Sequence, residues 1–181
     1  MKTRNTVTCS LMCAIVCVLG LFPPIYLPLI PVPIVLQNLG IMLSGSLLGK
    51  KNAFITICIF LLLVAIGLPV LPGMRGGIAV FFLPWVGFLL AFPISAYAIG
   101  WLFEKHNRQD SYIFAFLYNI FGGIVVMYTV AIPIVALVGH ISIYHTLIGS
   151  LIFIPGDMLK AALTAIIVVR LKKYAGHLFR Q

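Results

Sequence analysis

The sequence predicts an all-α integral membrane protein with six transmembrane helices. Of its 181 residues, 62% are hydrophobic and only 8% are charged, and the mean hydropathy is +1.18. A soluble domain carries about 25% charged residues, so this composition leaves little room for one. The apolar runs suit spanning helices of about 20 residues, and they do not alternate in polarity as strands of a membrane β-barrel do.

Each predicted span is bounded by charges or by proline and glycine. The first follows Met-Lys-Thr-Arg-Asn and is interpreted as a retained helix, because no clear small-residue cleavage site follows it. The second ends at Lys50-Lys51, the third at Pro69 and the fourth at Glu104. The sixth begins near Pro155, which a first helical turn tolerates. We expect one domain, 1–181, with spans at about 6–22, 34–49, 53–69, 79–103, 111–138 and 155–172, and a short amphipathic or re-entrant piece before the last.

The basic residues indicate how these spans are oriented. Six spans place both termini on one side, and cytoplasmic loops are enriched in lysine and arginine. One predicted side carries only Arg75, and the opposite side carries both termini and the other loop basic residues. We therefore expect the side with the termini to face the cytoplasm. The net charge of +9 does not predict nucleic-acid binding, because the basic residues interrupt apolar runs instead of forming a stripe. The cytoplasmic set is Lys2, Arg4, Lys50, Lys51, Lys105, Arg108, Arg170, Lys172, Lys173 and Arg180.

The proline-rich stretch 22–33 lies on the predicted outer side. Its prolines exclude a helix, because each lacks an N–H group and restricts the residue before it. Non-helical backbone at membrane depth is tolerated where it lines a cavity. The stretch is therefore predicted to be either a lid over a binding site or an ordinary connector.

The strongest candidate site is Asp157 with Lys160 in the sixth span. Asp157 is one of three acidic residues in the chain, and an ionisable residue in the hydrocarbon core costs about 2.5–3.5 kcal/mol on insertion scales. Lys160 lies three residues later on the same helical face. The pair is either a structural ion pair or a polar site facing a cavity. A carboxylate accepts and an ammonium donates, so together they could hold a urea or an amide, or Lys160 could attract an anion.

Other polar residues are weaker candidates. Arg75 would meet a carboxylate or phosphate of a ligand, or else be a solvated loop residue. Gln37 and Asn38 lie at the outer end of the second span, and Asn119 lies in the fifth; each would line a cavity or bridge helices. Enzymatic chemistry is not expected, because the chain has no GxxxxGK[ST] phosphate loop and no second carboxylate within a span to pair with Asp157.

Four segments resemble the BioY family of membrane proteins, in order along the whole chain. Pro-Val-Pro-Ile-Val-Leu-Gln-Asn (31–38) is similar to its P-V-P-I-T-L-Q signature, and 43–51 resembles L-A-G-x-L-L-G-x-K/R. Ala-Ile-Gly-Leu-Pro-Val (65–70) and Phe-Ile-Pro-Gly-Asp-Met-Leu-Lys-Ala (153–161) are similar to A-x-G-L-P-V-F and F-x-P-G-D-x-x-K-x. The family comprises biotin-specific substrate-binding (S) components of energy-coupling factor (ECF) transporters.

The resemblance implies an S-component-like bundle in the cytoplasmic membrane that takes up biotin. It implies that Asp157 and Lys160 are the polar ligand pair and that stretch 22–33 closes over the ligand. A membrane T component and two ATPases would supply the energy, so no cofactor is expected in this chain. Ser10 and Ala14 correspond to the family's A-x-x-x-A motif that contacts the T component, with serine in place of the first alanine.

One stretch departs from the family pattern. Where the family carries G-P-T-G-G-Y, this chain has Leu-Pro-Trp-Val-Gly-Phe (83–88). Trp85 replaces a small hydroxyl residue and Phe88 lacks a phenol, so contacts there would change and the ligand would be biotin held differently or a related molecule. An autonomous transporter and a non-transporting membrane scaffold are the remaining alternatives.

Overall fold

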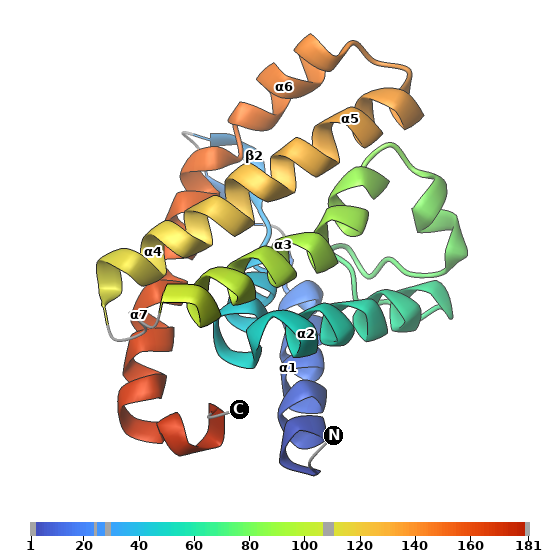
Figure 1. Ribbon diagram of the computed structural model, residues 1–181. Helices are drawn as coiled ribbons and strands as arrows, with labels where there is room; N and C mark the ends of the chain where they lie inside the picture. The colour runs from blue at the N-terminus through green and yellow to red at the C-terminus, as the bar shows by residue number, and fades with distance from the viewer. Residues whose placement is uncertain (1–2, 24, 28–29, 107–110, 180–181) are drawn as a thin grey trace.

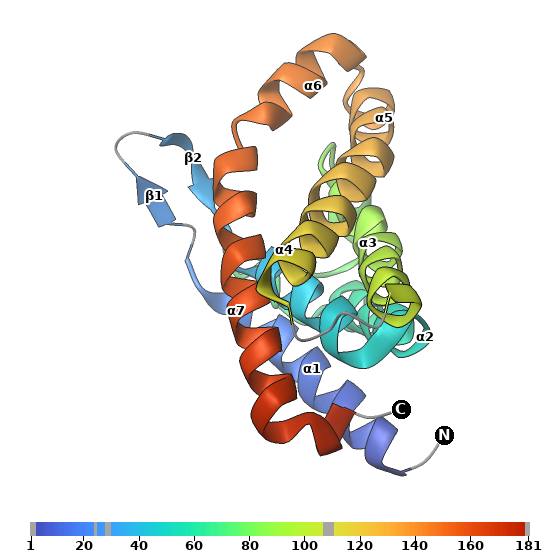
Figure 2. The ribbon, with the colours of Figure 1, turned by 60° about the vertical axis from the view of Figure 1, so that its left-hand side comes forward.

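The computed structural model describes residues 3–23, 25–27, 30–106 and 111–179. Helices pack side by side in a bundle, and the beginning of α1 and the end of α7 lie at the same end of it (Figures 1 and 2). The α-helices are α1 (Thr3–Leu21), α2 (Gln37–Ala65), α3 (Val86–His106), α4 (Tyr112–Ile120), α5 (Met127–Gly139), α6 (Ile143–Leu151) and α7 (Ile154–Phe179). A 3-10 helix, η1 (Ile78–Phe82), and a π-helical segment, η2 (Phe121–Val126), complete the helical elements described.

The helices agree with the predicted all-α membrane class. Among the described residues, α1, α2, α3 and the combined α4–η2–α5 segment are long and apolar enough to cross a membrane. The pair α6–α7, bent by 53°, counts as a fifth if it forms one broken span. Helix α6 is the short piece predicted before the last span, and its start is capped by the Ser142 hydroxyl, which accepts from the Tyr144 N–H.

Helix α2 contains a sharp break at Gly49, where φ is +73° and ψ is 169°. Only glycine adopts this backbone conformation without strain. The break separates the second predicted span from the third, so both are helical as expected. Helix α3 packs closely against it, since a Cβ on Gly100 would lie 2.5 Å from the Lys50 nitrogen.

The fourth predicted span begins later than expected, at Val86 instead of residue 79. Residues Ile78–Phe82 form the separate helix η1, and residues 83–85 form a bend and turn before α3. Pro84 has no N–H for an intrahelical bond, which favours this interruption. The apolar run continues through the interruption, so hydropathy alone placed the boundary too early.

The fifth predicted span is continuous but contains the π-helical segment η2 in its middle. Its two glycines allow close contacts: a Cβ on Gly122 would lie 2.2 Å from Ile99 Cγ1, and one on Gly123 2.3 Å from Met42 Cε. The Ser95 hydroxyl donates to the Gly122 carbonyl at 2.8 Å. A π turn adds one residue to the helix. The side chains of α5 are therefore rotated about the helix axis by about 100° relative to those of α4.

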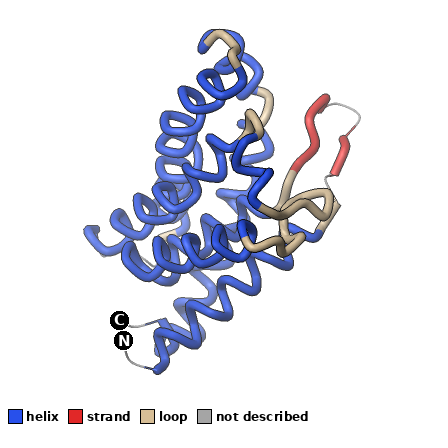
Figure 3. The backbone as a smooth tube through the Cα atoms, turned by 90° about the vertical axis from the view of Figure 1, so that its right-hand side faces the viewer, coloured by secondary structure: helices blue, strands red, loops and turns tan. Residues whose placement is uncertain are grey.

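The proline-rich stretch is non-helical, as predicted, but it contains regular strands. β1 (Ile25–Leu27) pairs antiparallel with β2 (Ile30–Ile34), with Ile25 opposite Ile34 and Leu27 opposite Ile30. Pro31 and Pro33 lie between the paired residues Ile30 and Ile34 of β2, and the register shifts between Ile25 and Leu27. The hairpin projects from the helical bundle (Figure 3) and lies beside α7 (Figure 2).

Charged residues lie near both ends of α3, in two separate groups. Near its end, Glu104 binds Lys50 at 3.0 Å, and Lys172 lies 4.5 Å from the centre of the Phe103 ring. At the other end, Trp85 immediately precedes the helix and Arg75 lies over its ring at 5.1 Å. Lys50 and Lys172 therefore lie near the end of α3 away from Arg75. Lys2, Arg108 and Arg180, which belong to the predicted cytoplasmic set, lie outside the described residues.

Candidate functional site

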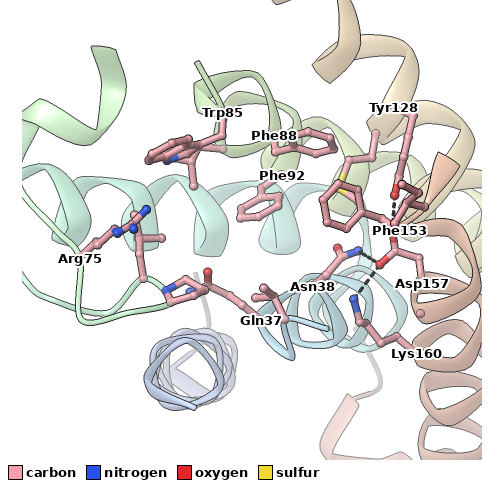
Figure 4. A pocket seen from close by; sticks show the side chains of 17 residues that line it. Gln37, Asn38, Arg75, Trp85, Phe88, Phe92, Tyr128, Phe153, Asp157 and Lys160 are labelled. Carbon is pink, nitrogen blue, oxygen red and sulfur yellow. Dashed lines mark hydrogen bonds and ion pairs between the residues drawn. The ribbon is translucent and has the colours of Figure 1, made fainter. Parts of the chain in front are cut away.

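A cavity of about 280 Å³ lies between the helices on the side away from the basic end. Its wall is mostly apolar and aromatic with a few polar groups, as in many small-molecule sites. Figure 4 shows Arg75 and Trp85 at one side of it and Asp157 with Lys160 at the other. The lining residues are Val35, Gln37, Asn38, Leu71, Pro72, Arg75, Trp85, Phe88, Leu89, Phe92, Met127, Tyr128, Ile152, Phe153, Gly156, Asp157 and Lys160.

Asp157 is the centre of the polar part of the cavity, and only 4% of it is exposed. Its Oδ1 accepts from Lys160 Nζ at 2.8 Å and from Asn38 Nδ2 at 3.0 Å. Its Oδ2 accepts from the Tyr128 hydroxyl at 2.6 Å. Charge-assisted bonds of this kind are short and strong, and three of them offset much of the cost of burying the charge.

The local sequence explains how α7 presents this carboxylate. Helix α7 begins at Ile154, so Asp157 lies in its first turn, where the helix dipole favours a negative charge. Pro155 has no N–H group. The N–H groups of a first helical turn have no intrahelical acceptor, so no helical hydrogen bond is lost there. The Asp157 backbone N–H donates to the Phe153 carbonyl at 3.0 Å.

Asp157 and Lys160 combine the two alternatives left open by the sequence. They form an ion pair, and Lys160 is only 6% exposed. Both also line the cavity. Burying an ion pair costs desolvation energy that its mutual attraction often does not recover, so the pair is a poor device for stability alone.

Gln37 and Asn38 both line the cavity, one of the two roles that the sequence left open for them, but they make different contacts. Asn38 binds Asp157, whereas Gln37 Nε2 donates to the Val70 carbonyl at 2.9 Å and ties the start of α2 to the following loop. Gly20 of α1 makes room for this contact. A Cβ there would lie 1.9 Å from the Val70 oxygen and 2.4 Å from Gln37 Nε2.

Asn119 does not line the cavity, whereas the other predicted ligand-binding residues do. It is fully buried, accepts from the Ser46 hydroxyl at 3.2 Å and donates to the Ala115 carbonyl at 2.8 Å. It therefore bridges α4 to α2, the second of the two roles considered for it. Ser10 and Ala14 are exposed on α1, while Cys9 and Cys13 are buried.

Trp85 and Phe88 were considered from the sequence, but Tyr128, Phe92 and Phe153 were not found by sequence reasoning as site residues. The Tyr128 ring packs edge-on against Phe88 with centroids 5.6 Å apart, and Phe88 also meets Phe153 at 6.4 Å. Position 88 has no phenol, but Tyr128 on the neighbouring helix α5 places one in the cavity. The only available signal was a hydroxyl within an otherwise apolar helix, which Tyr118 and Thr129 also display.

The arrangement is suited to binding and carries no sign of metal chemistry. Among the described residues, no group of three His, Cys, Asp or Glu side chains could hold a metal ion. The cavity instead offers a buried anion and a buried cation in contact, aromatic surface, and a guanidinium on the opposite side. A flat polar head with donors and an acceptor, joined to an apolar body and an anionic tail, would match it.

Known proteins resemble this chain over nearly its full length. The model of the BioY family matches residues 1–177. The chain is 40% identical over 171 residues to the "Probable biotin transporter BioY" of Bacillus subtilis, covering 94% of this chain and 91% of that protein. It is 44% identical over 172 residues to the "Biotin transporter BioY" of Rhizobium etli, covering 92% of each.

A solved structure extends the likeness to the fold. The crystal structure of the S-component for biotin from an ECF-type ABC transporter matches with a TM-score of 0.88 and 37% sequence identity. The match covers 99% of this chain and 97% of that one. This chain therefore has the same overall fold as that S component.

Proposed function

Because the chain belongs to the BioY family, we propose that it binds biotin and serves as the S component of an ECF transporter. The observation that carries the proposal is the buried Asp157–Lys160 pair at one end of an aromatic cavity. Biotin is a bicyclic urea with a carboxylate tail. Its polar head and its charged tail would each find a complementary group at the two sides of the cavity.

The proposed pose follows from donors and acceptors. Asp157 accepts from a ureido N–H, and Lys160 donates to the ureido carbonyl. The carboxylate of the tail pairs with Arg75, whose guanidinium suits a carboxylate and lies on the far side of the cavity from Asp157 (Figure 4). Trp85, which replaces a small residue of the family pattern, holds that guanidinium against its ring and so takes part in the tail subsite.

The proposal makes this chain a transport protein and not an enzyme. One six-helix membrane domain, residues 1–181, captures biotin in the cytoplasmic membrane, with both termini in the cytoplasm. The gathering of basic residues around Glu104, away from Arg75, supports this orientation. The hairpin β1–β2 is the proposed lid, and its position beside α7 supports that role.

In this proposal, a transmembrane T component and two cytoplasmic ATPases complete the transporter and hydrolyse ATP. Helix α1 is the proposed contact with the T component. Its outward side carries the small residues Ser10 and Ala14, and small residues let two membrane helices approach closely. Co-purification of this chain with a T component supports the assignment, whereas full-rate biotin uptake by the chain alone in liposomes would contradict it.

Equilibrium binding of biotin to the purified protein tests the central claim. We expect saturable binding by the wild type and a loss of about 10- to 100-fold in affinity for Asp157→Asn and for Lys160→Ala, because each leaves a buried polar group of the ligand unpaired. Glu104→Gln is the matched control. It also removes the carboxylate of an ion pair, but outside the cavity, so biotin affinity stays at the wild-type value.

Absence of saturable binding by the wild type would overturn the proposal. The same holds if Asp157→Asn changes only the thermal stability and leaves the biotin affinity intact, since the pair would then be structural.

A further inference from the structure

Away from the cavity, the second piece of α2 and the end of α3 share an exposed face. The two helices lie side by side, and the second piece of α2 begins after the break at Gly49 (Figure 1). At the break, α2 is in close contact with Gly100 of α3. Further from the break, the rings of Phe54 and Tyr97 meet edge-on with centroids 6.3 Å apart. Both rings are exposed, so this face points away from the protein interior.

Helical spacing continues this face toward the break. On α3, Trp101 and Lys105 follow Tyr97 at intervals of four residues, so the three lie on one side of the helix. On α2, Lys51 precedes Phe54 by three residues and lies on the same side, about one turn nearer the break. These side chains are all exposed. We call the set the α2–α3 surface: Lys51, Phe54, Tyr97, Trp101 and Lys105.

The α2–α3 surface carries positive charge that the described residues do not neutralise. Glu104 lies beside it, but both of its oxygens are engaged by Lys50: Oε2 lies 3.0 Å from Nζ, and Oε1 accepts from the backbone N–H at 2.8 Å. The other two acidic residues are the cavity carboxylate and Asp110, which lies outside the described residues. Within the described part of the chain, neither Lys51 nor Lys105 therefore has a carboxylate partner.

The order of groups on this surface matches an amphipathic anion. Lys105 Nζ lies 4.6 Å from the centre of the Trp101 ring, which holds the ammonium beside an exposed indole. Tryptophan and tyrosine favour the headgroup level of a membrane, and lysines near its surface attract anionic lipids. A small soluble anion would use only the ammonium groups. A phospholipid would use the exposed rings as well.

We infer that the α2–α3 surface binds the headgroup of an anionic phospholipid. The phosphate lies between Lys51 and Lys105. An acyl chain lies along the rings of Phe54 and Tyr97. The site is separate from the cavity and does not depend on the proposed ligand. Because Lys51 belongs to the first turn of the second piece of α2, the bound lipid joins the start of that helix to the end of α3.

The fluorescence of Trp101 tests the inference. The chain has two tryptophans, so Trp85→Phe leaves Trp101 as the only indole. This protein is reconstituted into phosphatidylcholine vesicles with a fixed fraction of phosphatidylglycerol. Either the phosphatidylglycerol or an equal amount of phosphatidylcholine carries brominated acyl chains, which quench an indole on contact. We expect stronger quenching by the anionic lipid, equivalent to about a fivefold or greater preference, which added salt reduces.

Lysine variants of the same protein locate the site. Lys51→Gln and Lys105→Gln should each lower the preference for phosphatidylglycerol by about 2- to 5-fold. Lys173→Gln is the matched control: it removes the same charge from an exposed lysine of α7 that lies 5.9 Å from the centre of the Tyr174 ring. It should keep the preference of the parent protein.

Two results would overturn the inference. If both brominated lipids quench Trp101 equally in the parent protein, the surface does not select an anionic headgroup. If all three lysine variants lower the preference equally, the attraction comes from the net charge of the whole protein and the α2–α3 surface is not a lipid site.

Discussion

The hydrogen bond from Tyr128 to Asp157 gives a prediction whose size follows from the geometry. The O···O distance of 2.6 Å is typical of a hydroxyl bound to a charged carboxylate, and both residues are at most 7% exposed. Tyr128→Phe removes the hydroxyl without opening a cavity, since the ring and its contact with Phe88 remain. Hydrogen bonds to charged groups contribute about 1.5–3 kcal/mol, so the free energy of unfolding of the ligand-free protein should fall by that much.

Thermal unfolding of the purified protein measures the effect. A loss of 1.5–3 kcal/mol corresponds to a fall in Tm of about 3–12 °C for a chain of this size. Biotin affinity should fall less than tenfold, because a ligand N–H still satisfies the oxygen that the tyrosine leaves. The Tm gain on adding biotin should therefore be retained.

Tyr118→Phe is an unusually close control. Tyr118 is also 7% exposed and packs against Phe103 with ring centroids 5.2 Å apart, but no described residue binds its hydroxyl. The same chemical change there should leave Tm unchanged or raise it, because it removes an unpaired buried polar group. If the two variants shift Tm equally, the Tyr128–Asp157 bond contributes nothing and the reasoning is refuted.

Three further predictions concern the loop, the tail subsite and α1. Gly20→Ala should lower both Tm and biotin affinity, because its Cβ would displace the Val70 carbonyl that Gln37 holds; Gly149→Ala, with open space around the Cβ, should do neither. Arg75→Gln should weaken biotin by about tenfold or more but leave biotin methyl ester unchanged in the same binding assay, and equal losses for both ligands would remove Arg75 from the tail subsite. Ala14→Trp should abolish co-purification with a T component while biotin binding persists, and retained co-purification would place the contact elsewhere.

The sequence located the helices and the charged pair because both depend on simple energetic rules. Apolar length identifies helices in a membrane, and a charge inside one is costly enough to be noticed, as at Asp157. The boundary at Val86 was missed because residues 78–85 are as apolar as the helix that follows. The π-helical turn at Phe121–Val126 was missed because the residues that contact it, Ser95, Ile99 and Met42, are distant from it in sequence.

The candidate site likewise contains features that the sequence predicted and features that it did not. Asn38 and Asn119 gave identical signals, an amide in an apolar helix, yet one lines the cavity and the other bridges α2 and α4. Which role an amide takes depends on what packs beside it, and the sequence does not specify that. Tyr128 was missed because its partner lies 29 residues away on another helix.

The break in α2 at Gly49 also bears on how the chain enters a membrane. At 1.5 Å per residue, the pieces 37–48 and 50–65 are about 18 Å and 24 Å long, against a hydrocarbon core of about 30 Å. Neither piece is long enough to be inserted alone as a stable span, and Lys50-Lys51 at the break resists passage through the bilayer. The two pieces therefore depend on each other and on α3, made later by the ribosome, so biogenesis should delay their final placement until residues near Gly100 have emerged.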